Sequence, residues 1–156
     1  MSVRIQTEDF DVARELAALR AGDRSVGAVA AFIGTVRDVN ANDEVATMTL
    51  EHYPGMTEKA LADIVDTAKA RWRIADALVI HRVGALQPAD QIVLVGVTSA
   101  HRGEAFAACE FIVDYLKTRA PLWKKEDTAT GARWVESRAS DDEAALRWQA
   151  PHKPVA

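Results

Sequence analysis

The stretch QIVLVGVTSAHRGEAFAACEFIVDYLKTRAP, residues 91–121, joins a strongly apolar strand to a long helix and decides the class of fold. Apolar residues dominate positions 91–98, which predicts a buried strand. The helix opens at His101 and is expected to end before Pro121, because proline disfavours helical geometry in the residue before it. Helical spacing predicts an inward face made of Ala105, Phe106, Cys109, Ile112, Val113 and Leu116.

Outward from this unit, the chain supplies strands both in pairs and in alternation with helices. Strands are predicted at residues 3–6, 26–36, 45–52 and 77–83, and a hairpin at residues 122–126 and 132–136. Three more helices are expected: one capped by Asp11, one after Pro54-Gly55, and one from a capping box at Ser140. The mixture favours an α+β fold with mixed or antiparallel sheets and about four helices over a doubly wound parallel sheet.

Three local expectations can be checked against a structure. Residues 37–44 form a polar loop that could close over a site as a lid. Residues 84–90, which include Pro88, are expected to form a turn. In the strand at 45–52, the alternating residues Ala46, Met48 and Leu50 are expected to face the core.

Length and composition predict an ordinary globular protein. The 156 residues suggest one domain over residues 1–150, followed by a loose tail at 151–156. Hydrophobic residues make up 49% and charged residues 27%, and the net charge of -4 gives no general attraction to nucleic acid or membranes. Any anion-binding site must therefore be local.

The cysteine and histidine content narrows the class of protein further. The single cysteine excludes a disulfide framework within the chain, and the N-terminus has no apolar segment typical of a signal peptide, so a cytoplasmic protein is expected. No apolar run approaches the roughly 20 residues that span a bilayer. The four histidines are scattered, so no metal site and no cofactor are predicted. His52, His81 and Cys109 are interpreted as core residues.

Four cations surround one proline in DYLKTRAPLWKKE, residues 114–126. Lys117 and Arg119 fall in the last helical turn, where the helix dipole favours cations by roughly 0.3–1 kcal/mol. That preference does not explain Lys124 and Lys125 beyond the proline. Crowded cations lower one another's pKa, which would help a lysine act as acid or base near neutral pH. A basic surface patch is the alternative, and composition leaves both open.

Two other places could bind an anion. His101 and Arg102 stand at a helix N-terminus, where free N–H groups and the helix dipole favour negative charge. Arg37 ends the apolar strand at 26–36, where a guanidinium can recognise a planar anion. The ordinary alternatives are a local cap, a solvated arginine and a simple strand terminator.

Five strings in the chain resemble the large, catalytic subunit of molybdopterin synthase: LEHYPGMTEKAL (50–61), VIHRVG (79–84), VGVTSAHR (95–102), DYLKTRAPLWKKE (114–126) and RWVESR (133–138). The resemblance runs from about residue 26 to residue 148. It implies an α/β-hammerhead fold and a homodimer that binds a small ubiquitin-like sulfur-carrier subunit at each end, giving a heterotetramer. The carrier's C-terminal glycine bears a thiocarboxylate, and two such sulfurs pass to cyclic pyranopterin monophosphate to form the molybdopterin dithiolene.

The resemblance also implies roles for individual residues. Lys117 and Lys124 are the expected catalytic residues, and both also bind substrate. The other expected substrate-binding residues are Thr35, Val36, Arg37, His101, Arg102, Lys125 and Glu126. Thr35 stands where some relatives have lysine, which weakens that contact. The alternative function is a non-catalytic, anion-binding scaffold subunit that uses the same basic pocket.

Overall fold

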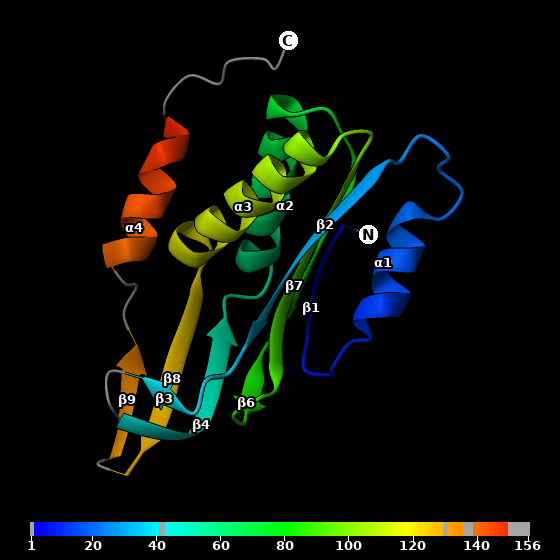
Figure 1. The fold of residues 1–156 in the computed structure, drawn as a ribbon. Coiled ribbons are helices and arrows are strands. Elements are labelled where there is room, and N and C mark those ends of the chain that lie inside the picture. Colours follow the sequence, from blue (N-terminus) through cyan, green and yellow to red (C-terminus); the bar gives the residue numbers. More distant parts are fainter. Residues whose placement is uncertain (1, 41–42, 130, 136–138, 150–156) are drawn as a thin grey trace.

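The computed structural model describes residues 2–40, 43–129, 131–135 and 139–149, and its first sheet has four strands (Figure 1). The predicted tail at 151–156 lies outside the described residues. The strand order is β1, β5, β7, β2, with β1 parallel to β5 and the other neighbours antiparallel. The bounds are Val3–Gln6 for β1, Ala28–Thr35 for β2, Ile74–Arg82 for β5 and Gln91–Ser99 for β7.

A second sheet of five strands lies beside the first (Figure 1). Its strands are β3 (Val39–Asn40), β4 (Asp43–His52), β6 (Gly84–Leu86), β8 (Leu122–Thr128) and β9 (Gly131–Val135). The described helices are α1 (Val12–Arg20), α2 (Met56–Arg71), α3 (Arg102–Arg119) and α4 (Ala139–Leu146), with a 3-10 turn at Arg147–Gln149. The predicted α+β fold with mixed sheets and about four helices is confirmed.

Helices cover both faces of the four-stranded sheet because its central strands β5 and β7 are apolar almost throughout. Helices α2 and α3 pack on one face, and α1 packs on the other, where Leu16 and Leu19 contact the cluster around Leu94 (Figure 1). Gly96 permits the close approach of α1, since a Cβ there would lie 2.9 Å from Leu16 Cδ2. These contacts pack α1 against β7.

Two predictions about this region were wrong, one of them only in part. Phe106 is 66% exposed, because the buried stripe of α3 follows positions 105, 108, 109, 112 and 116, and Phe106 is turned away from it. The turn expected at 84–90 is present only around Pro88, where Asp90 N donates to Gln87 O; residues 84–86 instead form strand β6, in which Leu86 is buried opposite Met48 of β4. Gly84, with φ of 93°, bends the chain from β5 into β6.

The strand predicted at 45–52 also departs from simple alternation. A register shift between Val45 and Thr47 leaves Val45 buried and Ala46 exposed, whereas Met48 and Leu50 face the core as expected. Strand β3 and the first residues of β4 form an antiparallel ribbon within the expected loop at 37–44. Helix α4 begins at Ala139, so Ser140 lies inside the helix and does not cap it.

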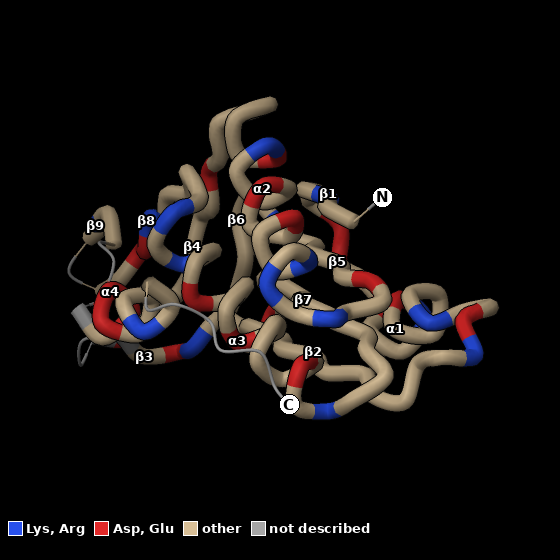
Figure 2. Tube along the Cα trace, turned by 90° about the horizontal axis from the view of Figure 1, so that it is seen from above, with Lys and Arg blue, Asp and Glu red and all other residues tan. Residues whose placement is uncertain are grey.

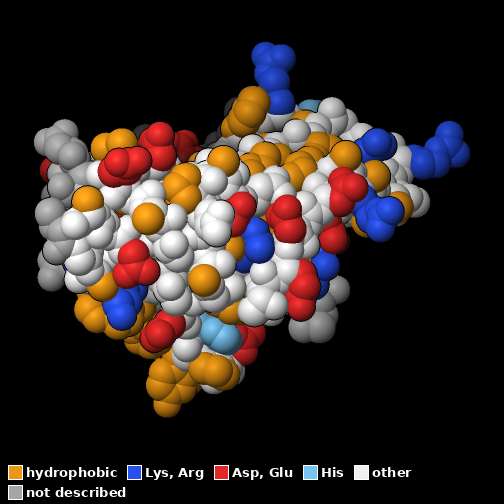
Figure 3. All heavy atoms as spheres, turned by 90° about the horizontal axis from the view of Figure 1, so that it is seen from below, with side chains coloured by type: hydrophobic (Ala, Val, Ile, Leu, Met, Phe, Trp, Pro, Cys, Tyr) orange, Lys and Arg blue, Asp and Glu red, His pale blue; other side chains and the backbone are white. Residues whose placement is uncertain are grey.

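The molecule is elongated, with α4, β8 and β9 at one end and α1 at the other (Figures 1 and 2). Seen from below, charges of both signs are interspersed over the surface, and hydrophobic side chains are exposed in small groups (Figure 3). No helix within the described ranges is long and apolar enough to cross a bilayer.

Candidate active site

A cavity of about 260 Å³ lies where the C-terminal end of α3 meets both sheets. Strands β2, β5 and β7 of the first sheet and β4, β8 and β9 of the second contribute to its wall, as does α4. Seven of its lining residues are polar or charged: Thr35, Arg37, His81, Lys117, Lys124, Glu126 and Asp141. The apolar part of the lining includes Met48, Ile92, Val93, Leu116 and Leu122.

Lys117 and Lys124 reach this cavity from two different elements. Lys117 lies in the last turn of α3, which ends at Arg119, just before Pro121, as predicted. The chain then reverses into β8, where Lys124 pairs with Leu50 of β4. Lys117 is exposed and Lys124 is partly buried, so Lys117 lies nearer the mouth of the cavity.

Alternation along β8 separates the cavity side of the strand from its outer side. Lys124 and Glu126 line the cavity, whereas Lys125 is exposed and its Nζ lies 6.0 Å from the ring centre of Trp134 on β9. Lys125 was predicted to bind substrate, but the structure places it on the opposite face of the sheet.

Burial lowers the pKa of the Lys124 ammonium, and the positive charge of Lys117 lowers it further. The charges of Asp141 and Glu126 act in the opposite direction, and that of Arg37 adds to the lowering. The predicted crowding of cations is therefore present at Lys124. A lysine with a lowered pKa is better suited to exchange a proton near neutral pH.

Glu126 is only 2% exposed, and its Oε1 lies 3.5 Å from a guanidinium nitrogen of Arg133 on β9. A buried carboxylate requires such a partner, because an uncompensated buried charge is strongly destabilising. Asp141, which follows Ser140 of the predicted capping box, lies on α4 and lines the cavity. Two acids thus balance part of the positive charge of the site.

Sequence reasoning missed the place of His81 in this site. The side chain is 2% exposed, in agreement with the predicted core position, yet it also lines the cavity. Burial lowers the pKa of His81 to about 4, and the charges of Lys124 and Lys117 contribute to the lowering. The available signal was a histidine inside the apolar run of β5, but it was weak, because histidines of intermediate burial also occur in ordinary cores.

Of the other residues predicted to bind substrate, some line the cavity and some lie away from it. Thr35 and Arg37 line it, at the end of β2 and just beyond. Val36 does not, since its side chain is 3% exposed and packs in the main core. His101 and Arg102 stand exposed at the opposite end of α3, about 22 Å from Lys117 at 1.5 Å per helical residue.

Known proteins are similar to this chain in sequence and in fold. A chain from Ralstonia nicotianae, named molybdopterin synthase catalytic subunit, is 67% identical over 94% of this chain and 84% of its own. The solved MoaE protein of Burkholderia ambifaria is 56% identical, with a TM-score of 0.82 over 96% of this chain and 99% of its own.

A chain in the solved complex of subunits 1 and 2 of molybdopterin-converting factor from Helicobacter pylori has the same fold at 19% identity, with a TM-score of 0.73. That match covers 88% of this chain and 92% of the other. The model of the MoaE protein family matches residues 5–119. By this match, and by 67% identity to a relative of which the chain covers 84%, the chain belongs to the MoaE protein family.

Proposed function

We propose that this chain is the catalytic subunit of a cytoplasmic molybdopterin synthase. It moves two sulfur atoms from the C-terminal thiocarboxylate of a small carrier subunit to cyclic pyranopterin monophosphate, and so forms the dithiolene of molybdopterin. The observation that carries the proposal is the convergence of Lys117 and Lys124 on one cavity that Arg37 also lines. The substrate phosphate and the thiocarboxylate are both anions, and such a site suits both.

The two lysines have complementary roles in this reaction. Lys117, nearer the mouth, meets the carrier's C-terminus and stabilises the negative charge that develops on the acyl oxygen, or exchanges a proton there. Lys124, whose pKa is lowered, assists proton transfer or the departure of a phosphate oxygen. Arg37 and Thr35 contact the phosphate or the pterin.

An external sulfur donor agrees with the state of the single cysteine. Cys109 is 6% exposed and does not line the cavity, and burial raises the pKa of its thiol to about 11. A protonated, enclosed thiol cannot relay sulfur, because the thiolate is the nucleophile. The thiocarboxylate of a carrier fills that role. The two-subunit composition of the Helicobacter pylori complex is the kind of assembly that we propose.

His101 and Arg102 act in the cavity of a second copy of the chain. Strand β2 ends the four-stranded sheet, and it runs from a pairing of Ala28 with Ser99, near His101, to Thr35 at the cavity. Antiparallel packing of two copies along β2 therefore brings His101 and Arg102 of one copy toward the cavity of the other. Exposed apolar side chains on β2, Val29 and Ile33, favour such packing.

The decisive experiment mixes this protein, the thiocarboxylated carrier and the cyclic pterin, and measures the dithiolene product. Product formation by the wild type and its near-abolition in Lys117→Ala are expected. A non-catalytic scaffold subunit predicts something else: Lys117→Ala and Lys124→Ala would lower only the affinity for substrate, and the rate at saturation would remain. No product from the wild type would contradict the proposed function.

A further inference from the structure

His81 occupies an unusual place in the cavity. It lies on β5 between Ile5 of β1 and Val93 of β7, and it is 2% exposed, yet it is one of the residues that line the cavity of Lys117 and Lys124, whose charges act on its ring. The roles given above to the cations leave this residue unused. The hydrogen-bond partners of its two ring nitrogens indicate what a buried imidazole beside two lysines can bind.

One ring nitrogen is bonded within the protein. His81 Nδ1 lies 2.8 Å from the backbone oxygen of Arg82. A carbonyl oxygen can only accept a hydrogen bond, so Nδ1 carries the hydrogen and donates it. In the neutral ring, Nε2 is then an acceptor. Within the described parts of the chain, no donor forms a hydrogen bond with Nε2.

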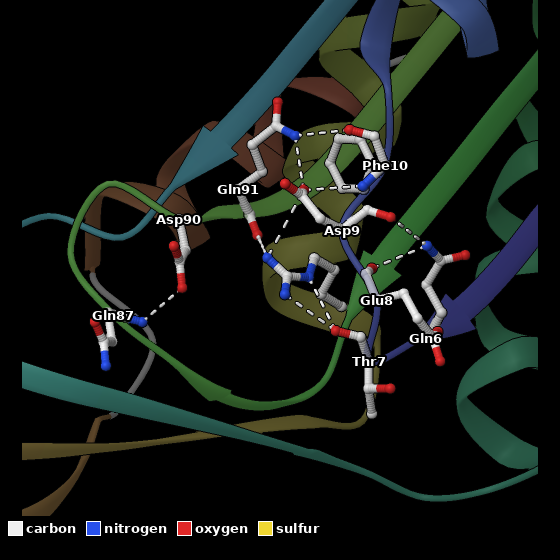
Figure 4. Close-up of polar contacts among 9 residues, drawn as sticks. Gln6, Thr7, Glu8, Asp9, Phe10, Gln87, Asp90 and Gln91 are labelled. Carbon is white, nitrogen blue, oxygen red and sulfur yellow. Dashed lines mark hydrogen bonds and ion pairs between the residues drawn. The ribbon is translucent and has the colours of Figure 1, made fainter.

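The backbone oxygen that accepts from His81 belongs to Arg82, whose side chain is hydrogen-bonded on both sides of β5. The adjoining polar contacts of Gln6, Asp9, Phe10 and Gln91 are drawn in Figure 4. The Arg82 guanidinium, on the other side of β5, donates to Thr7 O at 3.2 and 3.1 Å and to Gln91 O at 3.0 Å. The Gln91 side chain in turn donates to Asp9 and to the backbone oxygen of Phe10. This network ties the end of β5 to the segment after β1 and to β7. The carbonyl that accepts from His81 is thereby held in place.

The ring remains neutral at physiological pH. The groups that act on it electrostatically are Lys124, Lys117 and His52, and all three oppose a second proton on the imidazole. The other charged residues of the cavity wall are Arg37, Glu126 and Asp141. A neutral imidazole whose pKa is about 4 is a poor proton carrier near pH 7. Its useful property is the lone pair on Nε2.

We propose that His81 Nε2 is a substrate-binding acceptor, which receives a hydrogen bond from an N–H or O–H group of the bound pterin and so orients the ring. Cations hold the phosphate, but ammonium and guanidinium groups have no acceptor, so acceptors must come from other lining residues: Thr35, Glu126 and Asp141, of which Glu126 is paired with Arg133, and the neutral imidazole of His81. The pterin carries several N–H donors, and each donor that enters the cavity needs a hydrogen-bond acceptor. This inference rests on the proposed function for the identity of the ligand. It adds that His81 is the residue that orients the ligand in the cavity.

Two amide substitutions separate the two ring nitrogens. In His81→Asn the amide nitrogen replaces Nδ1 and can still donate to the Arg82 carbonyl, but no acceptor remains at Nε2. In His81→Gln the longer amide brings an acceptor oxygen close to the position of Nε2. His52→Asn is the matched control, since His52 does not line the cavity. Thermal unfolding verifies that each variant is folded.

The readout is the Kd of the cyclic pterin without carrier, measured by titration calorimetry, together with single-turnover sulfur transfer at saturating pterin. His81→Asn is expected to weaken binding roughly 10- to 100-fold, because a buried donor of the pterin loses its acceptor. His81→Gln should stay within about threefold of the wild type, and His52→Asn within about twofold. The single-turnover rate at saturation should fall less than the affinity.

Three results would overturn the proposal. The first is a folded His81→Asn variant with the Kd of the wild type. The second is equal weakening in His81→Gln and His81→Asn. The third is a shift of the basic limb of the pH profile in His81→Asn, which would make Lys124 the partner of Nε2. If His81→Asn does not fold, a folded His81→Gln decides alone: a retained Kd supports the acceptor role and a lost one contradicts it. A wild type that binds pterin but forms no dithiolene contradicts only the proposed function.

Discussion

Lys117, at the end of α3, and Lys124, on β8, line one cavity, and the charge of Lys117 lowers the pKa of Lys124. This relationship depends on Pro121, which lies between the two elements where the chain changes direction. A like charge nearby disfavours the ammonium form, so the pKa of Lys124 should rise when Lys117 is replaced by methionine. Carbon-13 NMR of reductively methylated lysines measures it. Lys125→Met, on the opposite face of the sheet, should leave the Lys124 signal unchanged, and an equal shift in both variants would contradict the coupling.

The same relationship predicts how the rate responds to single replacements on β8. Lys124→Ala should lower the single-turnover rate of sulfur transfer by roughly 10²- to 10⁴-fold, the range typical of a lost acid–base or charge-stabilising group. Lys125→Ala is the matched control one position along the strand, and it should change the rate by less than about threefold. Equal losses in the two variants would mean that the whole basic patch matters and that Lys124 has no special position.

The fold was predictable where pattern and burial agree. The strand and helix in residues 91–121 formed as expected because the apolar residues on both sides of Gly96, and those of α3 at positions 105, 108, 109, 111, 112 and 116, pack in the core. Phe106 was wrongly assigned to the buried face of α3, because helical spacing alone does not separate it from its neighbour Ala105. The width of the buried face depends on how the helix packs on the sheet. Strand β6 was missed because its pairing with β4 is a contact between distant segments.

The site was predictable to the extent that charge distinguishes its residues. Lys117, Lys124 and Arg37 were named as candidate anion-binding cations beside ordinary structural explanations, and they do line one cavity. His81 was not, since a lone histidine in an apolar strand also fits an ordinary core. The role proposed for it depends on its place beside the cavity, and that place follows from the meeting of two sheets. The order of residues along β5 does not contain this information.

Stability should depend on pH through His81. Its pKa is about 4 in the folded chain against 6.5 in the reference state, so the unfolded chain binds more protons between these values and stability rises with pH. The contribution is fully present above 6.5 and is lost as pH falls toward about 4. From pH about 7 to about 4.5, the loss should be roughly 2–3 kcal/mol of unfolding free energy. Urea unfolding of the wild type and of His81→Asn measures it, and an equal loss in both would assign the effect to other groups.

Close backbone contact predicts a destabilising substitution at Gly27, just before β2. A Cβ at Gly27 would lie 2.4 Å from the backbone oxygen of Ala100, so part of the backbone must shift. Gly27→Ala should therefore cost roughly 1–3 kcal/mol of unfolding free energy. A Cβ at Gly103, in the first turn of α3, would have no atom within 4 Å, and Gly103→Ala should be neutral or stabilise by up to about 1 kcal/mol. Urea unfolding of both variants tests the contrast, which fails if Gly27→Ala is as stable as the wild type.

The place of Arg102 far from the cavity of its own chain predicts complementation between two inactive variants. If each cavity combines Lys117 of one copy with Arg102 of the other, Lys117→Ala and Arg102→Ala are each inactive as homodimers. A mixed dimer then has one cavity with both substitutions and one with neither. Random exchange of subunits makes about half of the dimers mixed, so roughly a quarter of the wild-type activity should return. The measurement is dithiolene formation after the two variants are unfolded, mixed and refolded together. Activity that stays at the level of the separate variants would mean that each cavity is completed within a single chain.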